Sequence, residues 1–162
     1  MTPAERQTKI EAYGRAAEEL EAVLRELPPA MWTWRPAPDQ WTVHEIAVHI
    51  ADSEANSYVR ARRFMAEPGS GLMAYDEMAW ARALDYHAQS VAEAVELFRV
   101  LRRSTYHLIK RLPAAAWAHT AEHPENGRMT LDDWLVIYER HVRDHAAQMR
   151  VVRAAWEQAG RP

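Results

Sequence analysis

One long amphipathic helix, predicted for residues 130–160, constrains the fold of this chain more than any other segment. At about 100° per residue, its large apolar residues all fall within roughly 60° of one line along the helix. These residues are Leu131, Trp134, Leu135, Tyr138, Val142, Met149, Val152 and Trp156. The pattern predicts a helix that buries one face along most of its length.

Two histidines share the apolar side of this helix. His145 lies about 20° from the centre of the apolar line and His141 about 60° from it, whereas Glu139 and other charged residues point elsewhere. A buried imidazole without a partner costs about 1 to 3 kcal/mol. A divalent metal would satisfy both rings, because side chains four residues apart stand over one another on a helix. Hydrogen bonds to core carbonyls or hydroxyls would satisfy them too, and the spacing alone leaves both interpretations open.

A second helix with histidines is predicted to begin after Thr42 and to run to about Glu67. Thr42 is followed three residues later by Glu45, which is the capping-box pattern. Residues 68–71, Pro-Gly-Ser-Gly, then stop the helix.

The histidines of this second helix face different directions. His49 lies on the edge of the buried face, beside Ile46, and is the third candidate ligand. His44 points about 160° away from Ile46 at 100° per residue, so we expect it near the surface. Asp52 follows His49 by one turn and is close enough to orient its ring or to face solvent.

The rest of the chain supplies two more helices and a long connection. Helices are predicted for residues 2–27, with Thr2 as N-cap, and for residues 90–112. Residues 72–89 carry a shorter helical pattern that we assign to a crossover, and residues 113–129 form a connector. With five glycines in the chain and few β-branched residues, we predict a single all-α domain over residues 1–162.

Composition excludes several classes of function. The formal net charge is −3, and acidic residues are interleaved with the arginine clusters at residues 60–63 and 99–103, so these clusters are interpreted as solvated faces and no nucleic-acid partner is expected. The chain has no cysteine, so a metal site must use nitrogen and oxygen ligands. No 18-residue apolar run or signal peptide is visible, and we expect a cytoplasmic protein without a membrane partner.

Two segments together resemble a known family. The segment WTVHEIAVHIADSE, residues 41–54, precedes ERHVRDHAAQM, residues 139–149, by some ninety residues. In order, spacing and capping residues they resemble the DinB/YfiT-like family of small four-helix metalloproteins. The family shows a W-S/T-x-x-E-x-x-x-H-I segment on its second helix and an HxxxH on its last long helix.

The resemblance implies a fold, a metal and a chemistry. It implies an up-down-down-up four-helix bundle with a long crossover between the second and third helices, often as a homodimer. It also implies a divalent metal, typically zinc or nickel, held by residues that map onto His49, His141 and His145. Relatives with assigned activities are transferases that use low-molecular-weight thiols such as bacillithiol or mycothiol, and one branch isomerises maleylpyruvate with mycothiol.

These features predict a metal-dependent enzyme acting on a small-molecule substrate. Three neutral imidazoles leave a divalent ion with an open position, where it can activate water or a small thiol. A thiol would have to arrive as a co-substrate, because the chain has no cysteine. Tyr138, one turn before His141, is a candidate catalytic donor, although its place in the apolar stripe also fits a core residue. The alternative function is a stress-related metal-binding or protein-interaction module without catalysis.

Overall fold

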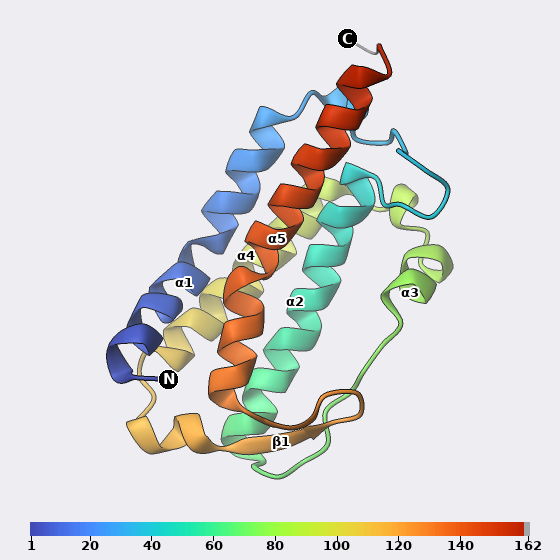
Figure 1. The fold of residues 1–162 in the computed structure, drawn as a ribbon. Coiled ribbons are helices and arrows are strands. Elements are labelled where there is room, and N and C mark those ends of the chain that lie inside the picture. Colours follow the sequence, from blue (N-terminus) through green and yellow to red (C-terminus); the bar gives the residue numbers. More distant parts are fainter. Residues whose placement is uncertain (161–162) are drawn as a thin grey trace.

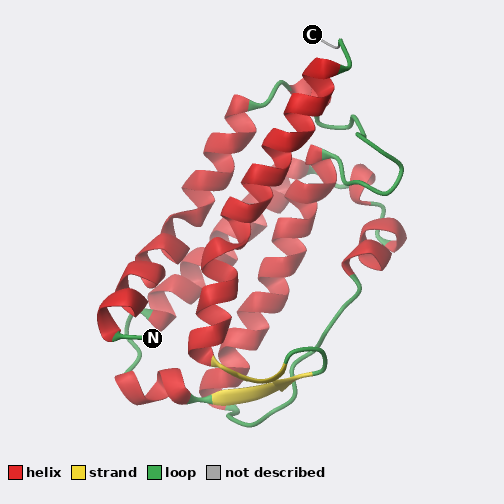
Figure 2. Ribbon diagram, viewed as in Figure 1, coloured by secondary structure: helices red, strands yellow, loops and turns green. Residues whose placement is uncertain are grey.

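Four long helices make up most of the molecule (Figures 1 and 2). The computed structural model describes residues 1–160. The long helices are α1 (Pro3–Glu26), α2 (Val43–Ala66), α4 (Val91–Ile109) and α5 (Leu131–Gln158). A short helix α3 (Glu77–Ala83) lies in the crossover, and the strands β1 (Thr120–His123) and β2 (Gly127–Thr130) form a hairpin. Single 3₁₀ turns occur at Pro29–Met31, Tyr86–Ala88 and Ala114–Ala118.

The helices follow the predicted up-down-down-up order. In Figure 1, α1 and α5 ascend, whereas α2 and α4 descend. The parallel pairs α1 with α5 and α2 with α4 pack most extensively against each other. Because α2 and α4 run in the same direction, residues 67–90 must return along the length of the bundle, and α3 lies in this return beside α2. The predicted topology and long crossover are therefore confirmed.

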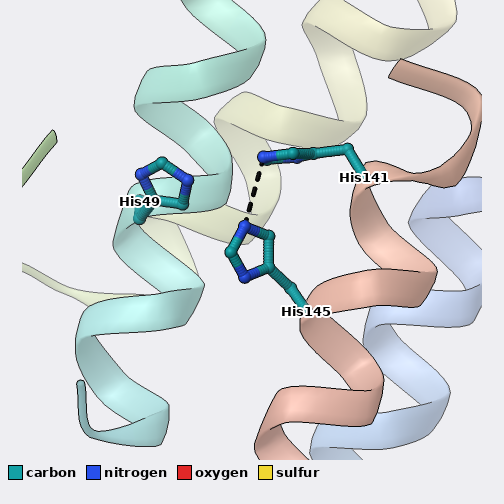
Figure 3. Close-up of side chains that lie close together, drawn as sticks. All are labelled: His49, His141 and His145. Atoms are coloured by element: carbon teal, nitrogen blue, oxygen red, sulfur yellow. Dashed lines mark hydrogen bonds between the residues drawn. The ribbon is translucent and has the colours of Figure 1, made fainter. Parts of the chain in front are cut away.

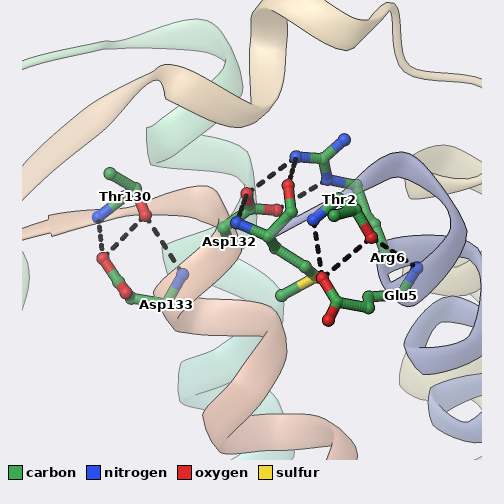
Figure 4. A network of polar contacts seen from close by, with 7 residues as sticks. Thr2, Glu5, Arg6, Thr130, Asp132 and Asp133 are labelled. Carbon is green, nitrogen blue, oxygen red and sulfur yellow. Dashed lines mark hydrogen bonds and ion pairs between the residues drawn. The ribbon is translucent and has the colours of Figure 1, made fainter.

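Hydrogen-bonded caps fix where the helices begin. Thr2, Thr42 and Thr130 each accept a bond from the backbone N–H three residues on, and the acidic side chain at that third position bonds back to the threonine N–H. Figure 4 shows two of these capping boxes close together at the base of the bundle. Arg6 links them, because its guanidinium donates two hydrogen bonds of 2.7 Å to Asp132 at the start of α5. α1 and α5 are thereby held in register at their N-terminal ends.

The core contains every apolar residue of the α5 stripe predicted above, and each of them is buried. Glu139, which was expected to point elsewhere, is also buried, so that expectation was wrong. Its carboxylate pairs with Lys9 at 3.4 Å and with Arg143 at 2.7 Å. α1 packs against this side of α5, and its lysine supplies a charge that periodicity within α5 cannot show.

The arginine cluster of α4 contains the largest departure from the sequence interpretation. Arg102 was assigned to a solvated face, yet its side chain is 1% exposed. Its Nη2 donates to Glu54 Oε2 at 2.6 Å and its Nη1 donates to the carbonyl of Tyr138 at 3.0 Å. Tyr13 donates from its hydroxyl to the other Glu54 oxygen at 2.6 Å. One buried polar network thus joins all four long helices.

Residues 113–129, which were predicted only as a connector, contain most of the β1–β2 hairpin. Pro124, Glu125 and Asn126 form the turn between the paired residues His123 and Gly127, and Gly127 has a φ of 67°. Short hairpin loops commonly place a glycine where the backbone needs a positive φ. Leu72 N–H donates to the Glu122 carbonyl at 2.7 Å, so the hairpin also holds the start of the crossover. Within the described residues, no helix is long and apolar enough to cross a membrane.

Candidate metal centre

His49, His141 and His145 converge from α2 and α5 on one point inside the bundle (Figure 3). One ring nitrogen from each lies within 4.8 Å of the others. The Nε2 atoms of His141 and His145 are 3.2 Å apart. The structure therefore brings together the three residues that the sequence singled out. His44 is turned away from them, and its Nε2 instead meets the carbonyl of Gln89 at 2.9 Å.

Burial keeps this cluster neutral. His49 is fully buried, and desolvation together with the neighbouring His145 lowers its pKa from 6.5 to about 3. Desolvation is also the main cause that lowers the pKa of His141 and of His145. Neutral imidazoles carry the free lone pairs that a metal ion requires.

His49 is the clearest sign that the cluster has a further ligand. Among the described residues, neither of its ring nitrogens has a hydrogen-bond partner. A buried polar group in that condition costs about 1 to 3 kcal/mol. Asp52, which was expected to orient this ring or to face solvent, does not bond the ring; it is partly exposed and accepts a hydrogen bond of 2.6 Å from the Tyr86 hydroxyl.

The histidines of α5 are held by polar neighbours. His145 Nδ1 lies 2.8 Å from Gln148 Oε1, an acceptor, so this nitrogen donates and the lone pair of the neutral ring lies on Nε2, facing the cluster. Ser53 Oγ lies 3.4 Å from His141 Nε2. Ligand nitrogens of a tetrahedral ion with bonds of about 2.0 to 2.1 Å lie roughly 3.3 Å apart, which is close to the spacing of the two Nε2 atoms. The donor set fits a divalent metal that accepts nitrogen ligands.

Trp41 shields the cluster on one side. Its ring stacks on His145, with planes 13° apart and centroids 6.4 Å apart, and lies 4.6 Å from the ring of His49. Trp41 is the first residue of the family segment at residues 41–54, so the sequence pointed to this residue but assigned it no role. Trp41 therefore shields one side of His49 and one side of His145 from water.

Two cavities reach the cluster from different directions. The larger, which we call the main cleft, has a volume of about 470 Å³ and reaches His145. Its lining residues are Asp39, Gln40, Trp41, Glu77, Met78, His145, Gln148, Val151 and Val152. The smaller, which we call the side pocket, has a volume of about 180 Å³ and reaches His141. The side pocket is bordered by Ser53, Arg60, Tyr75, Glu77, His123 and Tyr138, among others.

Tyr138 borders the side pocket and also belongs to the core. The residue is 4% exposed, and its hydroxyl accepts a hydrogen bond of 2.7 Å from Arg60 Nη1. Burial is the main cause that raises its pKa, although the neighbouring Arg60 acts in the opposite direction. Its ring centroid lies 6.2 Å from that of His141. The tyrosine thus keeps its proton at neutral pH and is placed beside the cluster, which leaves its catalytic role a prediction.

Glu77 is the residue of the site that the sequence interpretation missed. It is the first residue of α3, and its Oε2 lies 3.9 Å from His49 Nε2. Partial burial raises the pKa of its carboxyl above the ordinary value. Residues 72–89 were interpreted as a crossover alone, and nothing in a short helical pattern shows which long helix it will cover. Only the return of the chain beside α2 places this carboxylate at the histidines.

A four-helix bundle that carries histidines on its second and last long helices, converging in its interior, defines a class of helical candidate metalloproteins. The chain belongs to the DinB superfamily, whose family model matches residues 12–149.

Solved and curated relatives agree with this assignment. YfiT from Bacillus subtilis, described as a candidate metal-dependent hydrolase with an unusual four-helix-bundle topology, has the same fold, with a TM-score of 0.87 and 21% identity over 100% of this chain and 91% of that one. A candidate metal-dependent hydrolase of Oceanobacillus iheyensis is 29% identical over 67% of this chain and 63% of its own length. One from Bacillus mycoides is 30% identical over 70% of this chain and 65% of its own length. The matched region thus spans a little less than two thirds of the two curated hydrolases.

Proposed function

We propose that the protein is a metal-dependent enzyme in which His49, His141 and His145 hold a divalent ion, zinc or nickel. The observation that carries this proposal is the fully buried His49 ring, whose nitrogens have no partner among the described residues while two further imidazoles face it. When bound, such an ion would supply Lewis acidity to a small nucleophile at neutral pH. The surrounding residues hold the three rings neutral and orient them.

The reaction that we favour is transfer of a small thiol to an electrophile. Two cavities meet at the histidines, and two separate approaches suit a reaction with two substrates. The chain itself has no cysteine, so the sulfur must come from a co-substrate. Trp41, Met78 and Val152 give the main cleft an apolar wall for the electrophile. In this proposal Tyr138, whose hydroxyl accepts a hydrogen bond from Arg60, donates a hydrogen bond into the side pocket.

Hydrolysis is the second candidate, because the curated relatives are named as candidate metal-dependent hydrolases. Water would then replace the thiol as the nucleophile. The same three histidines would serve both reactions, so the site alone does not separate them.

A paired assay distinguishes these functions. Zinc- and nickel-loaded protein is incubated with monobromobimane and a panel of thiols, including bacillithiol and mycothiol, and conjugates are measured by mass spectrometry; hydrolysis of p-nitrophenyl esters is measured in parallel. We expect thiol-dependent turnover that falls about 100-fold or more in His141→Ala and is kept in His44→Ala. Ester hydrolysis without thiol transfer would select the second candidate. Turnover that is equal in His141→Ala and the parent would exclude catalysis at this site and favour a non-catalytic metal-binding module.

The resemblance to the family also leads us to propose a homodimer. Size-exclusion chromatography with light scattering measures its mass directly, and a single species of 18.7 kDa would contradict the proposal.

A further inference from the structure

The crossover helix α3 brings one carboxylate to the mouth of the histidine cluster. Glu77 is its first residue, and Figure 1 shows α3 alongside α2, the helix that carries His49. Glu77 Oε2 is 3.9 Å from His49 Nε2 and borders both the main cleft and the side pocket. A ligand that reaches the histidines through either cavity therefore comes close to this carboxylate.

Several contacts hold α3 in this position. Asp76 caps its start, accepting a hydrogen bond of 2.9 Å from Ala79 N–H. Trp41 Nε1 donates to Met78 Sδ, which fixes the helix against the wall of the main cleft. Tyr75 packs on Trp80 with ring centroids 4.5 Å apart. The position of Glu77 is thus set by the fold rather than by a free loop.

The main cleft carries negative charge that its own lining does not balance. Its lining includes Asp39 and Glu77 but neither lysine nor arginine. Arg35 bonds the carbonyl of the lining residue Gln40, but its charge is paired with Glu45 at 2.6 Å. Arg60 lies on the wall of the side pocket, where it donates to the carbonyl of Met73 and the hydroxyl of Tyr138 and keeps its positive charge. Glu125 borders the side pocket as well. An anion in the main cleft would therefore face Asp39 and Glu77 with no lysine or arginine in the lining, and Coulomb repulsion is strong at short range.

We infer that Glu77 is the residue that sets the charge selectivity of the main cleft: it admits uncharged or cationic electrophiles beside the three histidines and disfavours anionic ones. The inference rests on the proposed metal site and deepens it by naming a substrate class. The electrophile is an uncharged or cationic molecule with an apolar part that packs on Trp41 and Met78. Simple carboxylate or phosphate substrates are poor ligands of the main cleft.

Ligand binding to cobalt-loaded protein tests the inference without an activity assay. Cobalt(II) replaces the native ion, and visible absorption is followed during titration with azide, an anion, and with imidazole, a neutral ligand. Glu77→Gln removes the charge and keeps the shape of the side chain. We expect its azide affinity to rise about fivefold or more, with imidazole affinity changed less than about twofold, because only the anion feels the lost charge.

Asp85→Asn is the matched control. It removes one negative charge from the same crossover at a position that borders neither cavity, and asparagine tolerates its positive φ of 43°. Its azide affinity should stay within about twofold of the parent. Bound cobalt with unchanged azide affinity in Glu77→Gln, or an equal rise in Asp85→Asn, would overturn this inference alone. Failure of the parent protein to bind cobalt would overturn both this inference and the proposed metal site.

Discussion

At the scale of single residues, the fold buries the polar ring of His49 away from water. The ring is fully buried in the core, and its pKa is about 3 against 6.5 for an exposed histidine. In metal-free protein this residue destabilises the fold, because neither of its ring nitrogens has a hydrogen-bond partner among the described residues. A bound ion would give the ring the partner that it lacks, and the free energy of binding would stabilise the folded state.

The depressed pKa of His49 predicts how metal-free protein responds to acid. Between pH 6.5 and about pH 3 the unfolded chain binds a proton at this histidine and the folded chain does not. Stability is therefore lost as the pH falls, by up to about 1.4 kcal/mol per pH unit from this residue. Urea unfolding of metal-free protein at pH 7 and pH 5 measures the loss, and His49→Gln should show a smaller one. Equal losses in the parent and the variant would contradict the assignment.

The buried pair of Glu54 and Arg102 makes a second prediction for single residues. Arg102→Met should lower the free energy of unfolding by about 3 to 5 kcal/mol, because it leaves the Glu54 carboxylate buried without its partner. The double variant with Glu54→Leu removes both charges and should recover part of that loss. Chemical denaturation of the parent, both single variants and the double variant gives the coupling energy. Additive losses would show that the two side chains do not act as a pair.

At the scale of elements, the long helices could be predicted because local sequence determines them. The eight apolar residues of α5 recur with the helical period. The four long helices begin close to the predicted positions, and Thr2, Thr42, Ser90 and Thr130 cap them. The burial of Glu139 and Arg102 could not be predicted in this way. Each is made tolerable by a charge on another helix, which periodicity within one helix does not reveal.

The hairpin was missed although its turn signal was present. Gly127 has a φ of 67°, a conformation in which a β-branched side chain is strained by about 1 to 2 kcal/mol. Gly127→Val should therefore lower stability by about that amount and loosen the contact between Leu72 and Glu122. Gly71→Ala is the matched control, because a methyl group there meets open space at an ordinary φ. Thermal unfolding of both variants checks this, and equal melting temperatures would contradict the strain argument.

At the scale of the whole molecule, the order and direction of the helices bring the residues of the site together. Up-down-down-up connectivity sets α2 beside α5, so that His49 meets two histidines more than ninety positions later in the chain. The same connectivity requires a long return between α2 and α4, and that return carries Glu77 to the cluster. The histidines could be predicted from motifs on the helices, whereas Glu77 could not, because its role depends on where the crossover lies in space.

The central claim is that this fold holds one divalent ion at the three histidines, and metal content tests it most directly. Untagged protein, His145→Ala and His44→Ala are purified in parallel and measured by inductively coupled plasma mass spectrometry. The account predicts about one ion per chain in the parent and in His44→Ala, and almost none in His145→Ala. Metal-free parent protein that also fails to take up zinc or nickel, or equal metal content in all three, would contradict it.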